Sequence, residues 1–140
     1  MDKRFWLSGV AAFFIVFLGG WVVHGLLLTR DYSKLPQLFR PQSDVVPHFP
    51  FMVLAYLSLG FAFAWIYRQG INADRPWLIQ GVRFGIAAAL LSPVPMYLIY
   101  YVVQPMELST VIKQILGDAV TLIVCGIVVA LINRAAASSR

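Results

Sequence analysis

The sequence predicts an all-α integral membrane protein, a four-helix bundle with both termini in the cytoplasm. The first observation is a set of four apolar stretches, at residues 5–28, 49–67, 78–103 and 111–132. A helix of about 20 apolar residues crosses a hydrocarbon core about 30 Å thick, and each stretch is close to or above that length. The second is composition, because 60% of the 140 residues are hydrophobic and 12% are charged, against about 25% charged residues in soluble domains. We therefore expect one transmembrane domain over residues 1–140, surrounded by the lipid bilayer.

The first stretch follows the basic beginning MDKR and in this respect resembles a signal peptide. Its apolar run is longer than the roughly 7–15 residues of a signal core, and no small-residue cleavage site follows it. We expect it to be retained as a membrane helix.

The basic residues predict the orientation of the helices. One side of the membrane would carry Lys3, Arg4, Arg68, Arg75, Arg134 and Arg140, and the other Arg30, Lys34, Arg40 and Lys113. The side richer in Lys and Arg is normally cytoplasmic. The sequence therefore predicts a multi-pass protein of a bacterial inner membrane, with a long exterior loop over residues 29–48. The net charge of +5 is spread singly over the ends of the spans, so no nucleic-acid partner is predicted.

The long exterior loop has a helical pattern of its own. Leu35, Leu38 and Phe39 have the spacing of one helical face, and Pro41 would end the turn. A short helix at the membrane surface fits this pattern. An irregular loop anchored by the same apolar side chains is the alternative.

Small residues recur one helical turn apart in two of the spans. The third span contains Gly81, Gly85 and Ala89, and the second contains Gly60 and Ala64. Membrane helices associate by close backbone approach at such positions. We expect helix packing here, either within one chain or between chains of a homo-oligomer.

Two prolines interrupt the third span. Pro93 and Pro95 lie near its middle, and a proline inside a helix removes a backbone hydrogen bond and clashes with the preceding turn. The sequence therefore predicts a kink at these prolines. The kink either gives the helix its shape or opens the backbone beside a cavity.

Asp118 is an acidic residue about two turns inside the fourth span. Gln114, Asp118, Thr121 and Cys125 have the spacing of one narrow helical face. A carboxyl group at membrane depth is costly unless it is paired or hydrated, so this face should point into the bundle. It either serves assembly alone or forms a site for a proton, an ion or a ligand. Cys125 is the only cysteine, so no internal disulfide is expected.

The two histidines, His24 and His48, lie at the exterior ends of the first two spans. A polar cluster is expected at that level, made by His24, Asp31, Tyr32, Tyr97, Tyr101 and Asp118. Two histidines on different helices could also ligate haem iron or another metal. Their spacing is not diagnostic, and no cofactor is predicted.

Three segments resemble a known group of proteins. They are HGLLLTRDYSKLP at residues 24–36, PWLIQGVRFG at 76–85 and YLIYYVVQP at 97–105. They are similar to a family of small bacterial inner-membrane proteins with four predicted transmembrane helices, over nearly the whole chain. The resemblance implies that fold and location, and it brings no activity, cofactor or ligand with it.

The sequence favours a structural or accessory component of a larger membrane complex. A small oligomeric transporter or channel that uses Asp118 is the alternative, and a haem- or metal-binding protein that uses His24 and His48 is the second alternative. An enzyme is less favoured, because the sequence has no phosphate-binding glycine loop, no HExxH and no GxSxG motif.

Overall fold

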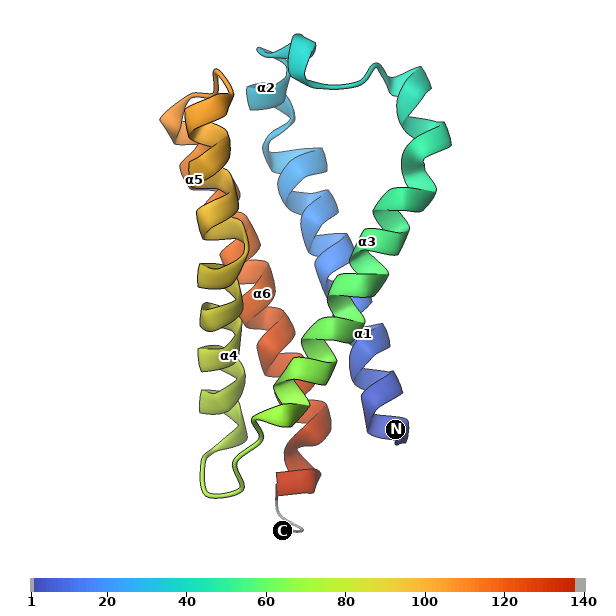
Figure 1. The fold of residues 1–140 in the computed structure, drawn as a ribbon, viewed down its shortest axis with the longest axis vertical. Coiled ribbons are helices and arrows are strands. Elements are labelled where there is room, and N and C mark those ends of the chain that lie inside the picture. The colour runs from blue at the N-terminus through green and yellow to red at the C-terminus, as the bar shows by residue number, and fades with distance from the viewer. Residues whose placement is uncertain (1, 138–140) are drawn as a thin grey trace.

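The computed structural model describes residues 2–137 and contains no β-strand among them. Four helical segments are long and apolar enough to cross a membrane: Lys3–Leu27, Gln42–Gln69, Trp77–Val103 and Leu108–Arg134. The predicted all-α class with four such helices is therefore confirmed. Both described ends of the chain lie at the same end of the bundle (Figure 1). Arg140, which entered the prediction of orientation, lies outside the described residues.

The first segment is made of two kinds of helix. Helix α1, Lys3–Gly20, is followed directly by the π-helix η1, Trp21–Leu27. The sequence predicts one continuous helix here, because hydropathy does not distinguish α from π hydrogen bonding. In a π-helix the backbone N–H donates to the carbonyl five residues earlier, and not four as in an α-helix. Leu28 N, for example, donates to Val23 O at 3.0 Å. Short π-helical segments inside α-helices are frequent at functional sites.

The connection to the second span is shorter than predicted. After α2, Thr29–Tyr32, one 3₁₀ turn, η2, covers Pro36–Leu38 in place of a longer surface helix. Helix α3 is Gln42–Gln69 and begins seven residues before the predicted start at residue 49. Its first residues, Gln42, Ser43 and Asp44, are polar, so hydropathy alone does not reveal this beginning.

The third span is divided where the two prolines occur. Helix α4, Trp77–Leu91, and helix α5, Pro93–Val103, meet at Ser92. Ser92 has φ −117° and ψ −80°, because the ring of a following proline disfavours the α-helical conformation. The kink at Pro93 and Pro95 stays a prediction. The last helix, α6, is Leu108–Ala137.

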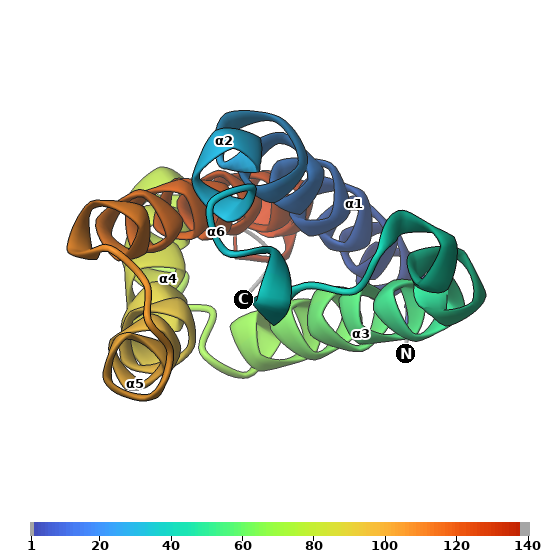
Figure 2. The same cartoon turned by 90° about the horizontal axis from the view of Figure 1, so that it is seen from above.

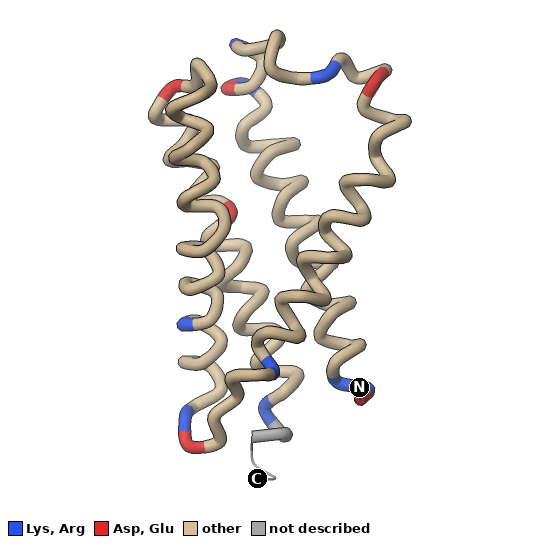
Figure 3. Tube along the Cα trace, viewed as in Figure 1, with Lys and Arg blue, Asp and Glu red and all other residues tan. Residues whose placement is uncertain are grey.

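Helices α1 and α3 cross, and α3 leans away from α1 beyond the crossing (Figure 1). Seen from above, α4 and α5 lie on one side of α6 and α1 on the other (Figure 2). Charged residues gather near the two ends of the bundle, with few between them (Figure 3). This distribution fits helices that cross an apolar layer.

The small residues mark the closest helix contacts. A Cβ added to Gly85 of α4 would lie 2.5 Å from Ile123 Cα of α6, and one added to Gly60 of α3 would lie 2.5 Å from Phe13 N of α1. The five small residues singled out in the sequence, Gly60, Ala64, Gly81, Gly85 and Ala89, are all buried within the chain. These stripes therefore serve packing inside the single chain.

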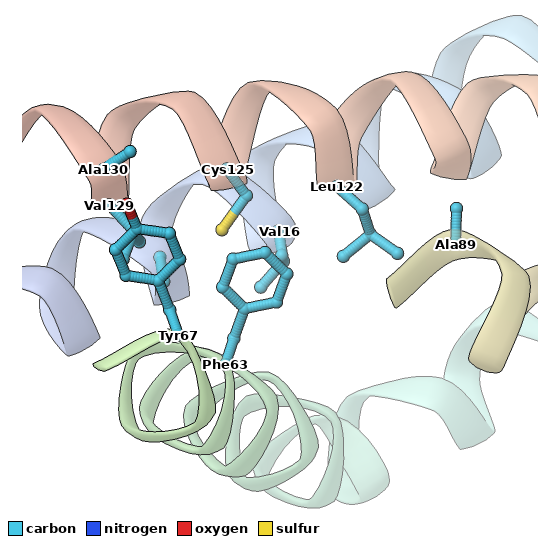
Figure 4. Packing of buried hydrophobic residues seen from close by; sticks show 9 residues of the cluster. Val16, Phe63, Tyr67, Ala89, Leu122, Cys125, Val129 and Ala130 are labelled. Carbon is cyan, nitrogen blue, oxygen red and sulfur yellow. The ribbon is translucent and has the colours of Figure 1, made fainter. Parts of the chain in front are cut away.

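Four of the long helices contribute to one apolar core. Its buried members are Ala12, Val16, Phe63, Tyr67, Ala89, Leu122, Cys125, Val129 and Ala130 (Figure 4). Beside this core, Asn133 of α6 donates a hydrogen bond to Ser8 Oγ of α1 at 2.8 Å. Both side chains are fully buried, so this pair joins α1 and α6 at the end of the bundle that carries the termini.

Substitution of Gly85 tests the packing of α4 on α6. Gly85→Ala places a methyl group against the backbone of Ile123 and should lower the free energy of unfolding by about 1–3 kcal/mol. Gly70→Ala is the matched control, because the atom nearest to the added Cβ would be Tyr67 O, at 4.0 Å. The measurement is thermal unfolding in detergent. Equal melting temperatures for the two variants would contradict the described contact.

Candidate functional site

A cavity of about 170 Å³ lies between α1, η1, α3, α5 and α6. Its polar lining consists of His24, Tyr56, Ser92, Tyr97, Asp118 and Thr121. The remaining lining residues are apolar or glycine. The cavity therefore combines a few convergent polar groups with an apolar wall, which is the usual character of a small-molecule site.

Asp118 is held by two side chains from other helices. The Tyr97 hydroxyl donates to Asp118 Oδ2 at 2.7 Å, and His24 Nε2 lies 3.2 Å from Asp118 Oδ1. Tyr97 Oη also lies 3.2 Å from His24 Nε2. Side chains from η1, α5 and α6 thus meet at one carboxyl group. The side chains of His24 and Asp118 keep 28% and 22% of their surface exposed, so both remain accessible from the cavity.

The network continues from the other ring nitrogen of His24. Nδ1 lies 2.5 Å from the Tyr32 hydroxyl, which also accepts a hydrogen bond from Gln114 Nε2 at 3.0 Å. Burial raises the pKa of Tyr32, so its hydroxyl stays protonated at neutral pH. Gln114 Oε1 is buried and has no hydrogen-bond partner among the described residues.

These contacts are compatible with a neutral His24 imidazole. Because Tyr32 accepts from Gln114, its own proton is free to donate to His24 Nδ1. His24 then carries its proton on Nε2 and donates it to Asp118 as a carboxylate. In this state the imidazole is neutral and Asp118 carries the only formal charge of the network.

A larger cleft of about 550 Å³ adjoins the cavity. The two share four lining residues, namely Gly20, His24, Tyr56 and Tyr97. The cleft extends between the upper parts of α1 and α3 and reaches the connection at Tyr32 and Phe39. It exists because α3 leans away from α1 above their crossing (Figure 1).

The residues predicted along the polar face of α6 separate into three groups. Asp118 and Gln114 join the network, and Thr121 lines the cavity while its hydroxyl donates to Gly117 O at 2.9 Å. Cys125 lies instead in the apolar core and is fully buried. The face from Gln114 to Cys125 is three helical turns long, so its last residue, Cys125, lies beyond the polar network and packs in the apolar core.

The predicted cluster at the exterior end is also divided. Tyr101 is 42% exposed and makes no side-chain hydrogen bond within residues 2–137. His48 is exposed and its Nδ1 lies 2.8 Å from Asp44 O, one turn earlier in α3. His24 and His48 therefore belong to different surroundings. No group of three or more His, Cys, Asp or Glu side chains that could hold a metal ion occurs in the described part of the chain.

Asp31 forms a separate ion pair with Lys113. Lys113 Nζ donates to both carboxylate oxygens of Asp31, at 3.1 and 3.0 Å, and Thr110 Oγ1 donates to Oδ1 at 3.3 Å. The hydrogen bond from Lys113 holds the pKa of Asp31 below its ordinary value of 3.8. The pair joins α2 to the beginning of α6. It also engages the ammonium group of Lys113, the basic residue of α6 that lies nearest to Asp118 along the helix.

Tyr56 and Gly20 contribute to the site without having been identified from the sequence. The Tyr56 side chain lines both the cavity and the cleft, and its hydroxyl occupies the space that a Cβ on Gly20 would fill. A tyrosine and a glycine inside apolar spans are common features. The sequence carries no signal that would single them out.

The Asp31–Lys113 pair predicts a loss of stability in acid. Because the pKa of Asp31 is lowered by folding, its contribution is present above its ordinary pKa and is lost as the pH falls through the folded-state pKa. Melting temperatures should be higher for the wild type than for Asp31→Asn near neutral pH, and the difference should shrink below a pH of about 4. Lys113→Met should remove the same dependence. A difference that stays constant into acid would contradict this assignment.

Comparison with family models, curated proteins and solved structures finds no match to this chain. The resemblance carried by residues 24–36, 76–85 and 97–105 therefore stays an expectation from the sequence.

Proposed function

We propose that this protein is a small proton-coupled transporter of a bacterial inner membrane. In it, Asp118 exchanges a proton while a small ligand occupies the adjoining cavity. The observation that carries the proposal is the contact between an acid, Asp118, and a base, His24, on the wall of a cavity inside the membrane-spanning part. Acidic and basic groups at membrane depth commonly mark proton or substrate paths.

The hydrogen-bond network has a second arrangement that holds one more proton. If Asp118 is protonated, it can donate to His24 Nε2, and the histidine proton then lies on Nδ1 and is donated to Tyr32. Rotation of the Gln114 amide brings Oε1 to the Tyr32 hydroxyl, which then donates to it. The unpartnered Oε1 of Gln114 supports this arrangement. The cluster can thus gain or lose a proton without losing its contacts.

Depth in the membrane also supports a proton site. Asp118 lies ten residues after Leu108, where α6 begins. The apolar span itself begins three residues later, at residue 111, so at 1.5 Å per residue the carboxyl group lies about 10 Å, or roughly a third of the way, into a hydrocarbon core about 30 Å thick. A carboxyl group placed there can reach water only through a cavity. Whether the cavity holds water or a ligand is therefore coupled to the charge of Asp118.

The interrupted third span favours transport in the same way. Ser92 and Pro93, where α4 and α5 meet, line the cavity that contains Asp118. Broken helices that border a cavity near the middle of the membrane are typical of secondary transporters. Non-helical backbone at that depth is tolerated where it faces protein or a cavity.

The other two functions have less support from the geometry. An accessory component could use the small-residue stripes to contact other chains, and these stripes pack inside the chain. A haem or metal site would use His24 and His48. Both ring nitrogens of His24 face Tyr32, Tyr97 or Asp118, and His48 lies on an exposed turn. These contacts favour a proton site over a pair of metal ligands.

The proposed orientation places both termini in the cytoplasm. Lys3, Arg4, Arg68, Arg75 and Arg134 are then cytoplasmic, in keeping with the positive-inside rule. The larger cleft, which reaches Tyr32 and Phe39, would adjoin the exterior side. A ligand in that cleft is therefore close to the membrane leaflet opposite to the termini.

Asp118→Asn tests whether the carboxyl group acts in transport or only in assembly. The amide keeps an acceptor for Tyr97 and His24, so the melting temperature should change by less than about 4 °C, which corresponds to about 1 kcal/mol. Proton movement that depends on a ligand should fall at least about tenfold, because no exchangeable carboxyl proton remains. The measurement uses proteoliposomes loaded with a pH-sensitive dye, to which cationic, neutral and anionic amphiphiles are added one at a time.

Glu107→Gln is the matched control, because Glu107 is an exposed acid paired with Lys34. It should behave as the wild type. Wild-type vesicles that move protons with none of the compounds would overturn the proposal. So would an Asp118→Asn protein that moves them at the wild-type rate.

A further inference from the structure

In the part of the chain that the structure describes, the cavity and the cleft are lined by one carboxyl group, that of Asp118, and by no lysine or arginine. Among the described residues that line them, the titratable groups are His24, Tyr32, Tyr56, Tyr97 and Asp118, and no Lys or Arg is present. With a neutral imidazole, Asp118 is the only formal charge. An anionic ligand would be repelled in these apolar surroundings, and a cation would be attracted.

The cationic groups nearest in the sequence do not change this balance. Lys113 is five residues before Asp118, and its ammonium group binds both oxygens of Asp31. Lys34 is paired with Glu107 at 3.3 Å, where both side chains are exposed. Neither lysine lines the cavity or the cleft. The carboxyl group of Asp118 therefore has no fixed positive neighbour inside the site.

Asp118 still has room for a ligand on its open side. A carboxylate offers about four lone-pair positions, and the described partners are Tyr97 on Oδ2 and His24 on both oxygens. About a fifth of the side chain is exposed, at 22%, and it lines the cavity. A bound cation can approach this side without displacing Tyr97 or His24.

The wall of the larger cleft is aromatic. Phe17 and Trp21 come from the first span, Phe49 and Tyr56 from α3, Phe39 from the connection and Tyr97 from α5. Aromatic faces attract organic cations through the ring quadrupole. The volume of about 550 Å³ falls within the roughly 300–1,000 Å³ of small-molecule sites. A ligand with several rings fits these walls better than a small inorganic cation does.

From these observations we propose that the ligand is a lipophilic organic cation, held between the aromatic cleft and the Asp118 carboxylate. This inference rests on the proposed transport function and names its substrate class. The step is a simple exchange. Protonated Asp118 releases its proton to water, the carboxylate that remains binds the cation, and charge is conserved. The groups that face Asp118 in this step are His24, Tyr97 and Tyr56 from other helices.

Tetraphenylphosphonium is a suitable probe because it is a permanent cation covered by aromatic rings. Its neutral counterpart is triphenylphosphine oxide, and its anionic counterpart is tetraphenylborate. Each is titrated separately by calorimetry into the full-length protein in nanodiscs. We expect the cation to bind at least about tenfold more tightly than the neutral compound, a difference of about 1.4 kcal/mol. Binding should weaken as the pH is lowered, and it should release protons, as seen from heats measured in two buffers of different ionisation enthalpy.

Two variants separate the contributions. Asp118→Asn should weaken binding of the cation at least tenfold while leaving the neutral compound unchanged. Tyr56→Leu should weaken binding of the cation several-fold and leave the release of protons on binding intact. Trp65→Leu is the aromatic control, since Trp65 is 56% exposed on α3 and lines neither space. Melting temperatures show that each variant is folded.

The outcomes distinguish this inference from the proposed function. Equal affinity for the cation and the neutral compound, or unchanged binding of the cation by Asp118→Asn, would overturn the cation assignment. If a neutral or anionic amphiphile moves protons in wild-type vesicles and needs Asp118 to do so, transport stands and the cation assignment fails. If no compound moves protons but tetraphenylphosphonium binds through Asp118, the cation site stands and transport fails.

Discussion

The lack of water inside a bilayer is the constraint on which the site depends. A carboxyl group about 10 Å inside the apolar span of α6 cannot be solvated by bulk water, so the chain itself must provide its partners. His24 and Tyr97 do this from two other helices, at 3.2 and 2.7 Å from Asp118 oxygens. The convergence of η1, α5 and α6 follows from this one requirement, and so does the continuation of the network to Tyr32 and Gln114.

Two irregularities of the backbone flank the same carboxyl group. The π-helix η1 carries His24, and the break at Ser92 separates α4 from α5 a little more than one turn before Tyr97. Each irregularity forgoes regular α-helical bonding at membrane depth, where unsatisfied backbone groups are costly. Elsewhere the helices are regular and pack closely through glycine, as at Gly85 and Gly60. Both irregularities border the cavity, since His24 and Ser92 line it.

The sequence predicts the spans well because hydropathy reports directly on the lipid environment. It also identifies Asp118 and His24, since a polar group in an apolar helix stands out against its neighbours. It does not reveal which polar groups meet. Asp31 and Asp118 were expected in one cluster, yet Asp31 binds Lys113, because α2 turns it toward the beginning of α6. Cys125 has the spacing of the polar face and lies in the core, since spacing defines a face and not a depth.

Tyr56 illustrates a further limit of prediction from sequence. Its part in the site arises from the crossing of α1 and α3 at Gly60, which brings the preceding turn of α3, with Tyr56, beside Gly20. Crossing angles depend on side-chain packing in three dimensions, and no periodic pattern encodes them. The aromatic character of the cleft likewise comes from rings on separate segments, each of which resembles an ordinary membrane-facing residue when it is considered alone.

The proposed function requires Asp118 to gain and lose a proton within the folded protein. Infrared spectroscopy of the carbonyl stretch of protonated carboxylic acids measures this directly in reconstituted membranes, with pH as the variable. Protonation of Asp118 predicts a band that grows as the pH is lowered and is absent in Asp118→Asn. The band should shift in frequency in Tyr97→Phe, because Tyr97 donates to that carboxyl group. A spectrum that is the same for the wild type and Asp118→Asn at every pH would contradict this protonation of Asp118.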